Sequence, residues 1–174
     1  MPMTAPAFKI KKAILIPFGI CAGLLLCLLI LAVLGKGSTL ERTLLALVSL
    51  ATAALFLLAR DRGILFTDQG IIVRKYFRTK EILRDEISHV GCVILRKRVY
   101  LLLTTSKGFF ILSNAYENFS ALVGRIVAQV APEKVEEEVR VQAEKPITSR
   151  SDVISLWLAV FVIAGLVVLK LTSN

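Results

Sequence analysis

Two groups of lysines and arginines are the residues of this chain best suited to binding another molecule. Both lie close to expected strand turns: Arg74, Lys75, Arg78 and Lys80 in one group, Arg96, Lys97 and Arg98 in the other. Beside an anionic lipid leaflet, each such charge contributes on the order of 1 kcal/mol. We therefore expect a lipid-binding or partner-binding surface, while a solvated hairpin that obeys the positive-inside rule is the plainer reading. Because side chains alternate along a strand, Arg74 and Lys75 cannot face the same surface.

Residues that could perform catalysis or hold a metal form no recognisable pattern. There is no Ser/His/Asp or Cys/His arrangement and no glycine-rich phosphate loop. His89 is the single histidine; by alternation it shares a side with Ile87, Gly91 and Val93, which favours a structural residue. The three cysteines form no CxxC pair and are interpreted as small apolar residues: Cys21, Cys27 and Cys92. We expect a non-enzymatic protein with no cofactor and no metal.

The composition is that of an integral membrane protein. Of the 174 residues, 56% are hydrophobic, and the mean hydropathy is +0.73. The excess lies in three stretches, residues 13–34, 43–59 and 153–171, and a span needs roughly 20 apolar residues. The first two form a helical hairpin. No Asp, Glu or Arg lies in the middle of a span, which argues against an ion pathway.

The distribution of lysines and arginines beside the spans sets the expected orientation, in a chain whose net charge is +9. Lysines 9, 11 and 12 precede the first span, and arginines 60 and 62 follow the second span on the same side of the membrane. The connection between the two spans, on the other side, has only Lys36 and Arg42, offset by Glu41. We expect an integral inner-membrane protein, and the positive-inside rule predicts that its N-terminus, residues 1–12, and its soluble domain are cytoplasmic. The third span places the C-terminus outside. No motif for nucleic-acid binding accompanies the charge.

Small residues within the spans are candidates for close helix packing. Gly19 and Gly23 form a GxxxG motif, and Ser49, Ala53 and Ala54 lie along the second span. Such residues let helices approach closely, either within the hairpin or between copies of the chain in a homo-oligomer.

Residues 60–131 read as one small antiparallel β domain closed by a helix. Short apolar runs separated by turn residues predict strands at 64–67, 71–78, 81–83, 87–95, 99–104 and 109–112. The period then changes to that of an amphipathic helix whose apolar face runs from Phe119 to Val130. Asn114 and Glu117 have the spacing of a capping box, so we expect this helix to begin near Ala115 and to end at Ala131 and Pro132. Residues 132–152 read as a polar tether, with an acidic, solvated run at 136–138.

Three local patterns in this domain resemble the bacterial PH-like domains. They are "FTDQGIIV", "EILRDEISHV" and "SNAYENFSALVGRI". The resemblance covers about residues 63–130 and implies an antiparallel β-barrel or sandwich with a C-terminal capping helix. It also implies a binding or scaffolding module. Six strand candidates are found rather than seven, and a third span is unusual for such proteins.

The expected architecture is an α+β membrane protein: a transmembrane hairpin, a PH-like domain, a tether and a third transmembrane helix. We expect the domain to bind anionic lipid headgroups or an unidentified membrane or cytoplasmic protein, in a scaffold, assembly or regulatory role. The alternative is an accessory subunit of a transporter or other membrane complex, in which the transmembrane helices are the binding part.

Overall fold

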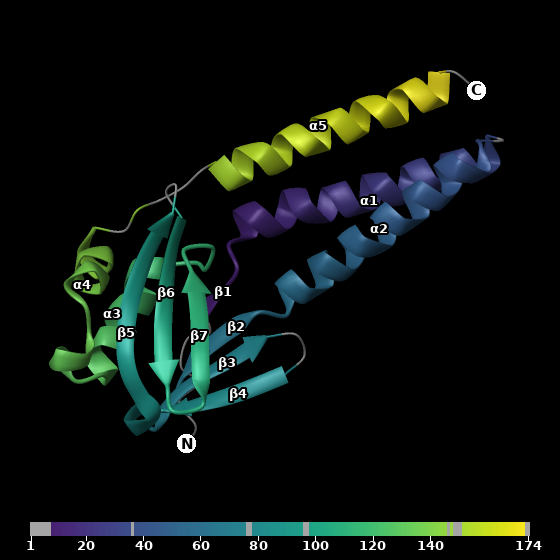
Figure 1. Cartoon of the computed structure of the whole chain (residues 1–174). Coiled ribbons are helices and arrows are strands. Elements are labelled where there is room, and N and C mark those ends of the chain that lie inside the picture. Colours follow the sequence, from purple (N-terminus) through teal and green to yellow (C-terminus); the bar gives the residue numbers. More distant parts are fainter. Residues whose placement is uncertain are drawn as a thin grey trace. The chain divides into compact units, whose positions relative to one another are not determined.

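The chain forms two compact units, one helical and one rich in β-strands (Figure 1). The computed structural model describes residues 8–35, 37–75, 78–95, 98–145, 147 and 151–172. The β-rich unit comprises residues 1–11 and 61–149, and the helical unit comprises residues 12–60 and 150–174. The β-rich unit is therefore discontinuous in sequence, with the first two long helices inserted near its start.

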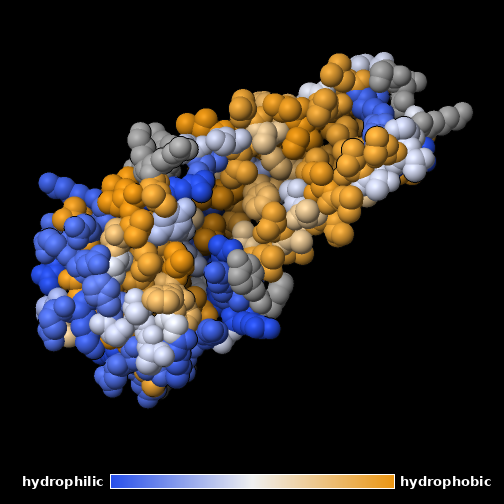
Figure 2. All heavy atoms as spheres, viewed as in Figure 1, coloured by the Kyte–Doolittle hydropathy of each residue, from blue (hydrophilic) through white to orange (hydrophobic). Residues whose placement is uncertain are grey.

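The helical unit contains three helices that are long and apolar enough to cross a membrane. They are α1 (Lys12–Leu34), α2 (Thr39–Arg60) and α5 (Ser151–Thr172). These helices confirm the three expected apolar segments, each extended by a few residues, and hydrophobic residues dominate their surface in Figure 2. Ser38 caps α2, because its Oγ accepts a hydrogen bond from the Glu41 N–H at 3.2 Å. The Lys170 ammonium in the last turn of α5 lies 2.7 Å from the Glu41 carboxylate in the first turn of α2.

The β-rich unit contains two antiparallel sheets. The first has the order β1-β2-β3-β4, with β1 (Phe8–Lys9), β2 (Gly63–Phe66), β3 (Gly70–Lys75) and β4 (Arg78–Leu83). The second has the order β5-β6-β7, with β5 (Ile87–Leu95), β6 (Arg98–Thr105) and β7 (Gly108–Ser113). All six expected strands are present. The expected boundary between the second and third of them is wrong, because residues 78–80 already belong to β4, and the described part of β3 ends at Lys75. A single turn of 3-10 helix (η1, Arg84–Glu86) forms the bend between the two sheets.

Strand β1 is a seventh strand, and the expectation that residues 1–12 lie outside the soluble domain is wrong for the residues from Phe8 onward. Phe8 pairs with Ile64, and Lys9 pairs with Gly63. Ile10 forms a bridge with Tyr116, so the same short segment also joins the chain after β7. The pattern of this segment is too short to predict a strand, because only Phe8 and Ile10 alternate before the first apolar span begins.

Helix α3 (Phe119–Gln129) closes the β-rich unit with the expected apolar face. Phe119, Leu122, Val123 and Ile126 are buried. The predicted capping box is wrong: the helix begins four residues later than expected, and the buried Asn114 donates a hydrogen bond from Nδ2 to the Ile147 carbonyl at 3.1 Å. Residues 115–117 are not helical because their backbone pairs with the N-terminal segment. For example, Glu117 N–H donates to the Lys9 carbonyl at 2.8 Å.

The segment expected to be a polar tether is instead part of the β-rich unit. It contains a second 3-10 turn (η2, Pro132–Lys134) and helix α4 (Glu137–Glu144), which contacts α3 and β5. Val135, Val139 and Gln142 are buried, and Val135 forms a parallel bridge with Val90 of β5. The high local charge conceals this short buried stripe, whose members lie four and three residues apart and of which only the two valines are apolar.

Replacing Val139 by Ala should destabilise the β-rich unit by about 2 kcal/mol, since two buried methyl groups are lost and a cavity is left. Val139 is fully buried, whereas Val141 on the same helix is 48% exposed. Val141→Ala is therefore the matched control, and it should leave stability unchanged within about 0.5 kcal/mol. The measurement is hydrogen exchange of α3 and β5 in the full chain in detergent. Equal exchange in the two variants would mean that α4 does not pack as described.

Candidate functional site: a basic groove between two strand edges

The inner face of the first sheet changes from apolar to basic along the β3–β4 hairpin. Its cross-strand pairs are Ile71 with Ile82, Val73 with Lys80, and Lys75 with Arg78. Ile71 and Ile82 are buried in the core, at 0% and 1% exposure. Since alternate residues share a face, Lys75, Arg78 and Lys80 stand on this same core-facing side.

These three cations line a groove of about 560 Å³ between the two sheets. The β3–β4 wall consists of Val73, Lys75, Arg78 and Lys80, and the opposite wall consists of residues 109–112 of β7. The Lys80 ammonium lies 5.6 Å from the centre of the Phe110 ring, within the range of a cation–π contact. Leu112 is buried at 1% exposure, so Phe110 and Leu112 share the inward face of β7. None of the described residues that line the groove is acidic.

Strands β4 and β7, which flank the groove, are the terminal strands of their sheets. The other two sheet edges are covered by the chain itself. Beside β1, Lys11 N–H donates to the Ala115 carbonyl at 2.9 Å. Beside β5, Glu136 N–H donates to the Val90 carbonyl at 3.0 Å. Among the described residues, no comparable backbone pairing is recorded along the outer edges of β4 and β7.

The structure brings together only part of the basic set singled out from the sequence. Arg74 faces the opposite side of the sheet, where it forms an ion pair of 2.9 Å with Asp61. Arg98 alternates with the buried Val99 and therefore lies on the outer face of the second sheet. Arg96 and Lys97 lie outside the described residues. The β7 wall was not anticipated, because nothing in a short apolar strand indicates which basic hairpin it will face.

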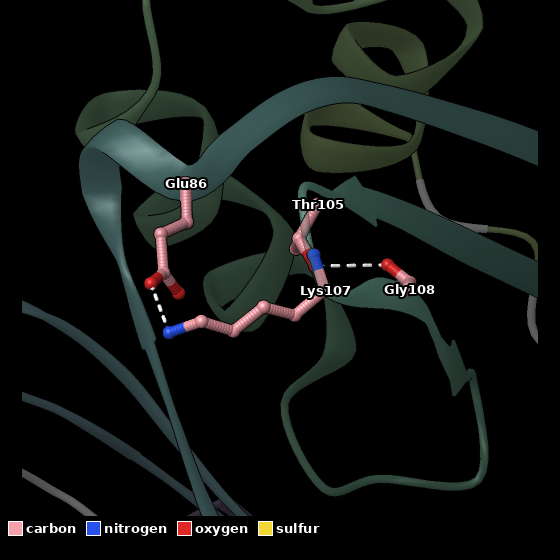
Figure 3. A network of polar contacts seen from close by, with 4 residues as sticks. All are labelled: Glu86, Thr105, Lys107 and Gly108. Carbon is pink, nitrogen blue, oxygen red and sulfur yellow. Dashed lines mark hydrogen bonds and ion pairs between the residues drawn. The ribbon is translucent and has the colours of Figure 1, made fainter.

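The turn before β7 is fixed by a small polar network, shown in Figure 3. The Lys107 ammonium forms an ion pair with the Glu86 carboxylate, and the Thr105 hydroxyl donates to the Gly108 carbonyl at 2.9 Å. Gly108 has a φ of +124°, a conformation that side chains rarely adopt. The hydrogen bond from Lys107 lowers the pKa of Glu86 below its ordinary value. The network thus anchors the first residue of the strand that walls the groove.

His89 and Glu136 form a second polar contact, which holds α4 against β5. His89 Nε2 lies 2.8 Å from Glu136 Oε1, and Glu136 Oε2 accepts a hydrogen bond from the Cys92 N–H at 3.0 Å. A Cβ on Gly91 would approach Glu136 Oε2 to 3.0 Å, so glycine gives this carboxylate room. An irregularity of register between Ile87 and His89 turns His89 outward, and the expected alternation with Ile87 is wrong. Glu136 is bonded as well, although its side chain remains 40% exposed. Glu137 and Glu138 are exposed, as expected for a solvated run.

The two glycines of the GxxxG motif have different surroundings in the helical unit. A Cβ on Gly19 would lie 3.2 Å from the Phe56 ring of α2, whereas a Cβ on Gly23 would meet nothing within 4 Å. Gly19 therefore permits close packing within the hairpin. Ser49 of α2 is buried as well.

The chain matches no protein-family model, no curated protein and no solved structure in the three comparisons made.

Acidification should loosen α4 from β5. The hydrogen bond from His89 and then that from the Cys92 N–H lower the pKa of Glu136 below its ordinary value of 4.5. Ionised Glu136 is therefore favoured in the folded state, and its stabilising contribution is complete above pH 4.5 and lost as the pH falls through the lowered value. The measurement is hydrogen exchange of α4 and β5 between pH 6 and pH 3, corrected for intrinsic rates.

The variant Glu136→Gln isolates this contribution, because Glu86 has a lowered pKa and the same sign of pH dependence. The variant should exchange faster than the wild type at pH 6, and the difference should shrink as the pH falls toward 3 and Glu136 of the wild type is protonated. A constant difference across the whole range would show that Glu136 acts by packing alone.

Proposed function

We propose that this chain is a non-enzymatic integral membrane protein whose β-rich unit binds an anionic group in the groove between β4 and β7. The single observation that supports this most is the position of Lys75, Arg78 and Lys80 on the core-facing side of the sheet, with no acidic residue in the lining. All three side chains are exposed and therefore accessible to a ligand. Lysine and arginine form charge-assisted hydrogen bonds with carboxylate or phosphate oxygens. The anionic group belongs to a protein partner or to a lipid headgroup.

We also propose that the β-rich unit is a PH-like domain. The resemblance noted in the sequence is supported by two sheets of four and three antiparallel strands followed by helix α3. Under this proposal the two transmembrane helices interrupt the domain between its first and second strands. The role of such a protein is that of a scaffold, assembly factor or regulator of another membrane complex.

The proposed topology places the N-terminus and the β-rich unit in the cytoplasm and the C-terminus outside. Two independent observations support it. The lysines and arginines favour this side by the positive-inside rule. In addition, β1 pairs with β2 across the inserted hairpin, so Phe8 and Ile64 must lie on the same side of the membrane, which two spans provide and one would not.

A photo-reactive phenylalanine analogue at position 109 should crosslink to the bound partner in native membranes, because Phe109 lines the groove and is 74% exposed. The double variant Arg78→Ala, Lys80→Ala should lower the yield of crosslinked product at least fivefold. Arg74→Ala is the matched control: it removes a cation from the same hairpin but from the other face, and it should leave the yield unchanged.

The same analogue at Leu50, which is 70% exposed on α2, tests the alternative that the transmembrane helices are the binding part. Crosslinks to a protein from position 50, with none from position 109, would favour the accessory-subunit function and remove the groove from consideration.

Alkaline phosphatase is active only outside the cytoplasm, and green fluorescent protein is fluorescent inside it. Fused after Asn174, the phosphatase should be active and the fluorescent protein dark. Inserted at Lys107, in the β6–β7 turn, the fluorescent protein should be fluorescent and the phosphatase inactive. The reverse pattern would overturn the orientation, and two reporters on the same side would exclude α5 as a span.

A further inference from the structure

Strand β7, Gly108–Ser113, is uncharged, and no backbone of the described residues pairs with its outer edge. Exposed strand edges promote association with other strands, and most proteins protect them with charges, bulges or covering segments. Here residues 115–117 cover the β1 edge and residues 135–136 cover part of the β5 edge. The β4 edge carries Arg78, Lys80 and Glu81, and inward-pointing charge is itself a protection against edge pairing. The charges therefore protect the β4 edge against pairing, whereas β7 has no charge of its own to protect its edge.

The hydrogen-bonding groups of β7 that face the open edge follow from its register. Asn114 N–H donates to the Val99 carbonyl at 3.0 Å, which identifies a hydrogen-bonded pair. Pairs of this kind recur at every second residue of an antiparallel ladder, so Leu112 and Phe110 bond to β6. The N–H and C=O groups of Phe109 and Ile111 therefore point to the open edge. The side chains of these two residues are 74% and 57% exposed on the outer face of the sheet.

The groove specifies what kind of strand could pair there. A strand added to β7 would direct alternate side chains inward, to the groove that Lys75, Arg78 and Lys80 line, and the others outward beside Phe109 and Ile111. Inward side chains that are acidic would complement the cations. Outward side chains that are apolar would cover exposed hydrophobic surface. The complementary ligand thus alternates acidic and apolar residues.

We propose that the β7 edge is a receptor for strand addition by an extended segment of a partner protein with alternating acidic and apolar side chains. This proposal rests on the proposed function of the groove and adds the mode of binding and the chemistry of the partner. Main-chain hydrogen bonds to Phe109 and Ile111 provide affinity, and the three cations select the acidic side chains. A lipid headgroup has no backbone to satisfy the strand edge, so the edge favours a peptide.

The test uses the full chain in nanodiscs of neutral phosphatidylcholine and a fluorescein-labelled heptapeptide of alternating valine and glutamate with blocked ends. Fluorescence anisotropy should show binding at least tenfold tighter than that of the same peptide with lysine in place of glutamate. Two further peptides carry N-methyl groups on all valines or on all glutamates. Because successive residues of a strand bond to opposite edges, one methylated peptide should lose binding at least tenfold and the other should retain it.

Ile111→Pro removes an N–H from the open edge while proline remains tolerated on an edge strand, and it should weaken binding of the acidic peptide at least tenfold. Ile111→Val, which keeps both the N–H and an apolar β-branched side chain, is its control and should weaken binding far less than Ile111→Pro does. The double variant Arg78→Glu, Lys80→Glu should reverse the preference toward the lysine peptide. Hydrogen exchange of β5 and β6 verifies that each variant is folded.

The outcomes separate this proposal from the one beneath it. One result would overturn strand addition and leave the anion-binding groove intact. In it, charge reversal alters binding, but Ile111→Pro binds like the wild type and both methylated peptides bind like the unmethylated one. No difference between the acidic and basic peptides, with no effect of charge reversal, would overturn both. Absence of peptide binding, together with binding of short-chain phosphatidylglycerol that depends on Arg78 and Lys80, would identify the ligand as a lipid and also overturn strand addition.

Discussion

The pairing of four residues, Phe8 to Lys11, with two distant segments is the constraint on which the β-rich unit depends. On one side Phe8 and Lys9 pair with Ile64 and Gly63. On the other, Ile10 bridges Tyr116, and Lys11 N–H bonds to the Ala115 carbonyl. Side-chain packing reinforces the pairing. The Phe8 and Phe66 rings pack edge to face with their centres 5.7 Å apart. The Arg125 guanidinium lies about 6 Å from the centre of each ring.

This pairing links the order of assembly to the membrane helices. The residues that must meet are separated by more than fifty positions, most of which belong to α1 and α2. Long-range pairing of this kind forms late, because closing a long loop costs conformational entropy before the favourable contacts can form. Here the loop is a hairpin of two helices that are long and apolar enough to cross a membrane, and forming the hairpin brings the two ends of the loop together. Closure of the β-rich unit therefore depends on formation of this hairpin.

Regular features of the fold were predictable from the sequence, and irregular ones were not. The three long apolar segments are recognisable from their length, and the six strands from short apolar runs between turn residues. The buried face of α3 is recognisable from its helical period. The failures lie where tertiary bonds override local preference. Asn114 has the right spacing for a helix cap but bonds to Ile147, and the acidic segment around Glu136 hides the buried Val139.

Only the basic residues of the candidate site were predictable from the sequence, because the rest of the site depends on tertiary packing. The sequence identifies Lys75, Arg78 and Lys80 as basic residues near a turn, yet alternation alone does not say which face of a strand is the inner one. That assignment requires Ile71 and Ile82 to be recognised as core residues across the hairpin. The opposite wall, Phe109 to Leu112, comes from the other sheet, and its position depends on how the two sheets pack.

The three inward cations are difficult to explain by stability alone. A sheet that continued its apolar inner face beyond Ile71 and Val73 would carry aliphatic residues at positions 75, 78 and 80 and could pack directly against Phe110 and Leu112. Charged side chains cannot be desolvated cheaply, so they keep the two layers apart and the gap between them hydrated. The Phe110 ring offers Lys80 a contact that an aliphatic residue would not. The same residues therefore hold the groove open and give it its charge, and both properties favour binding over packing.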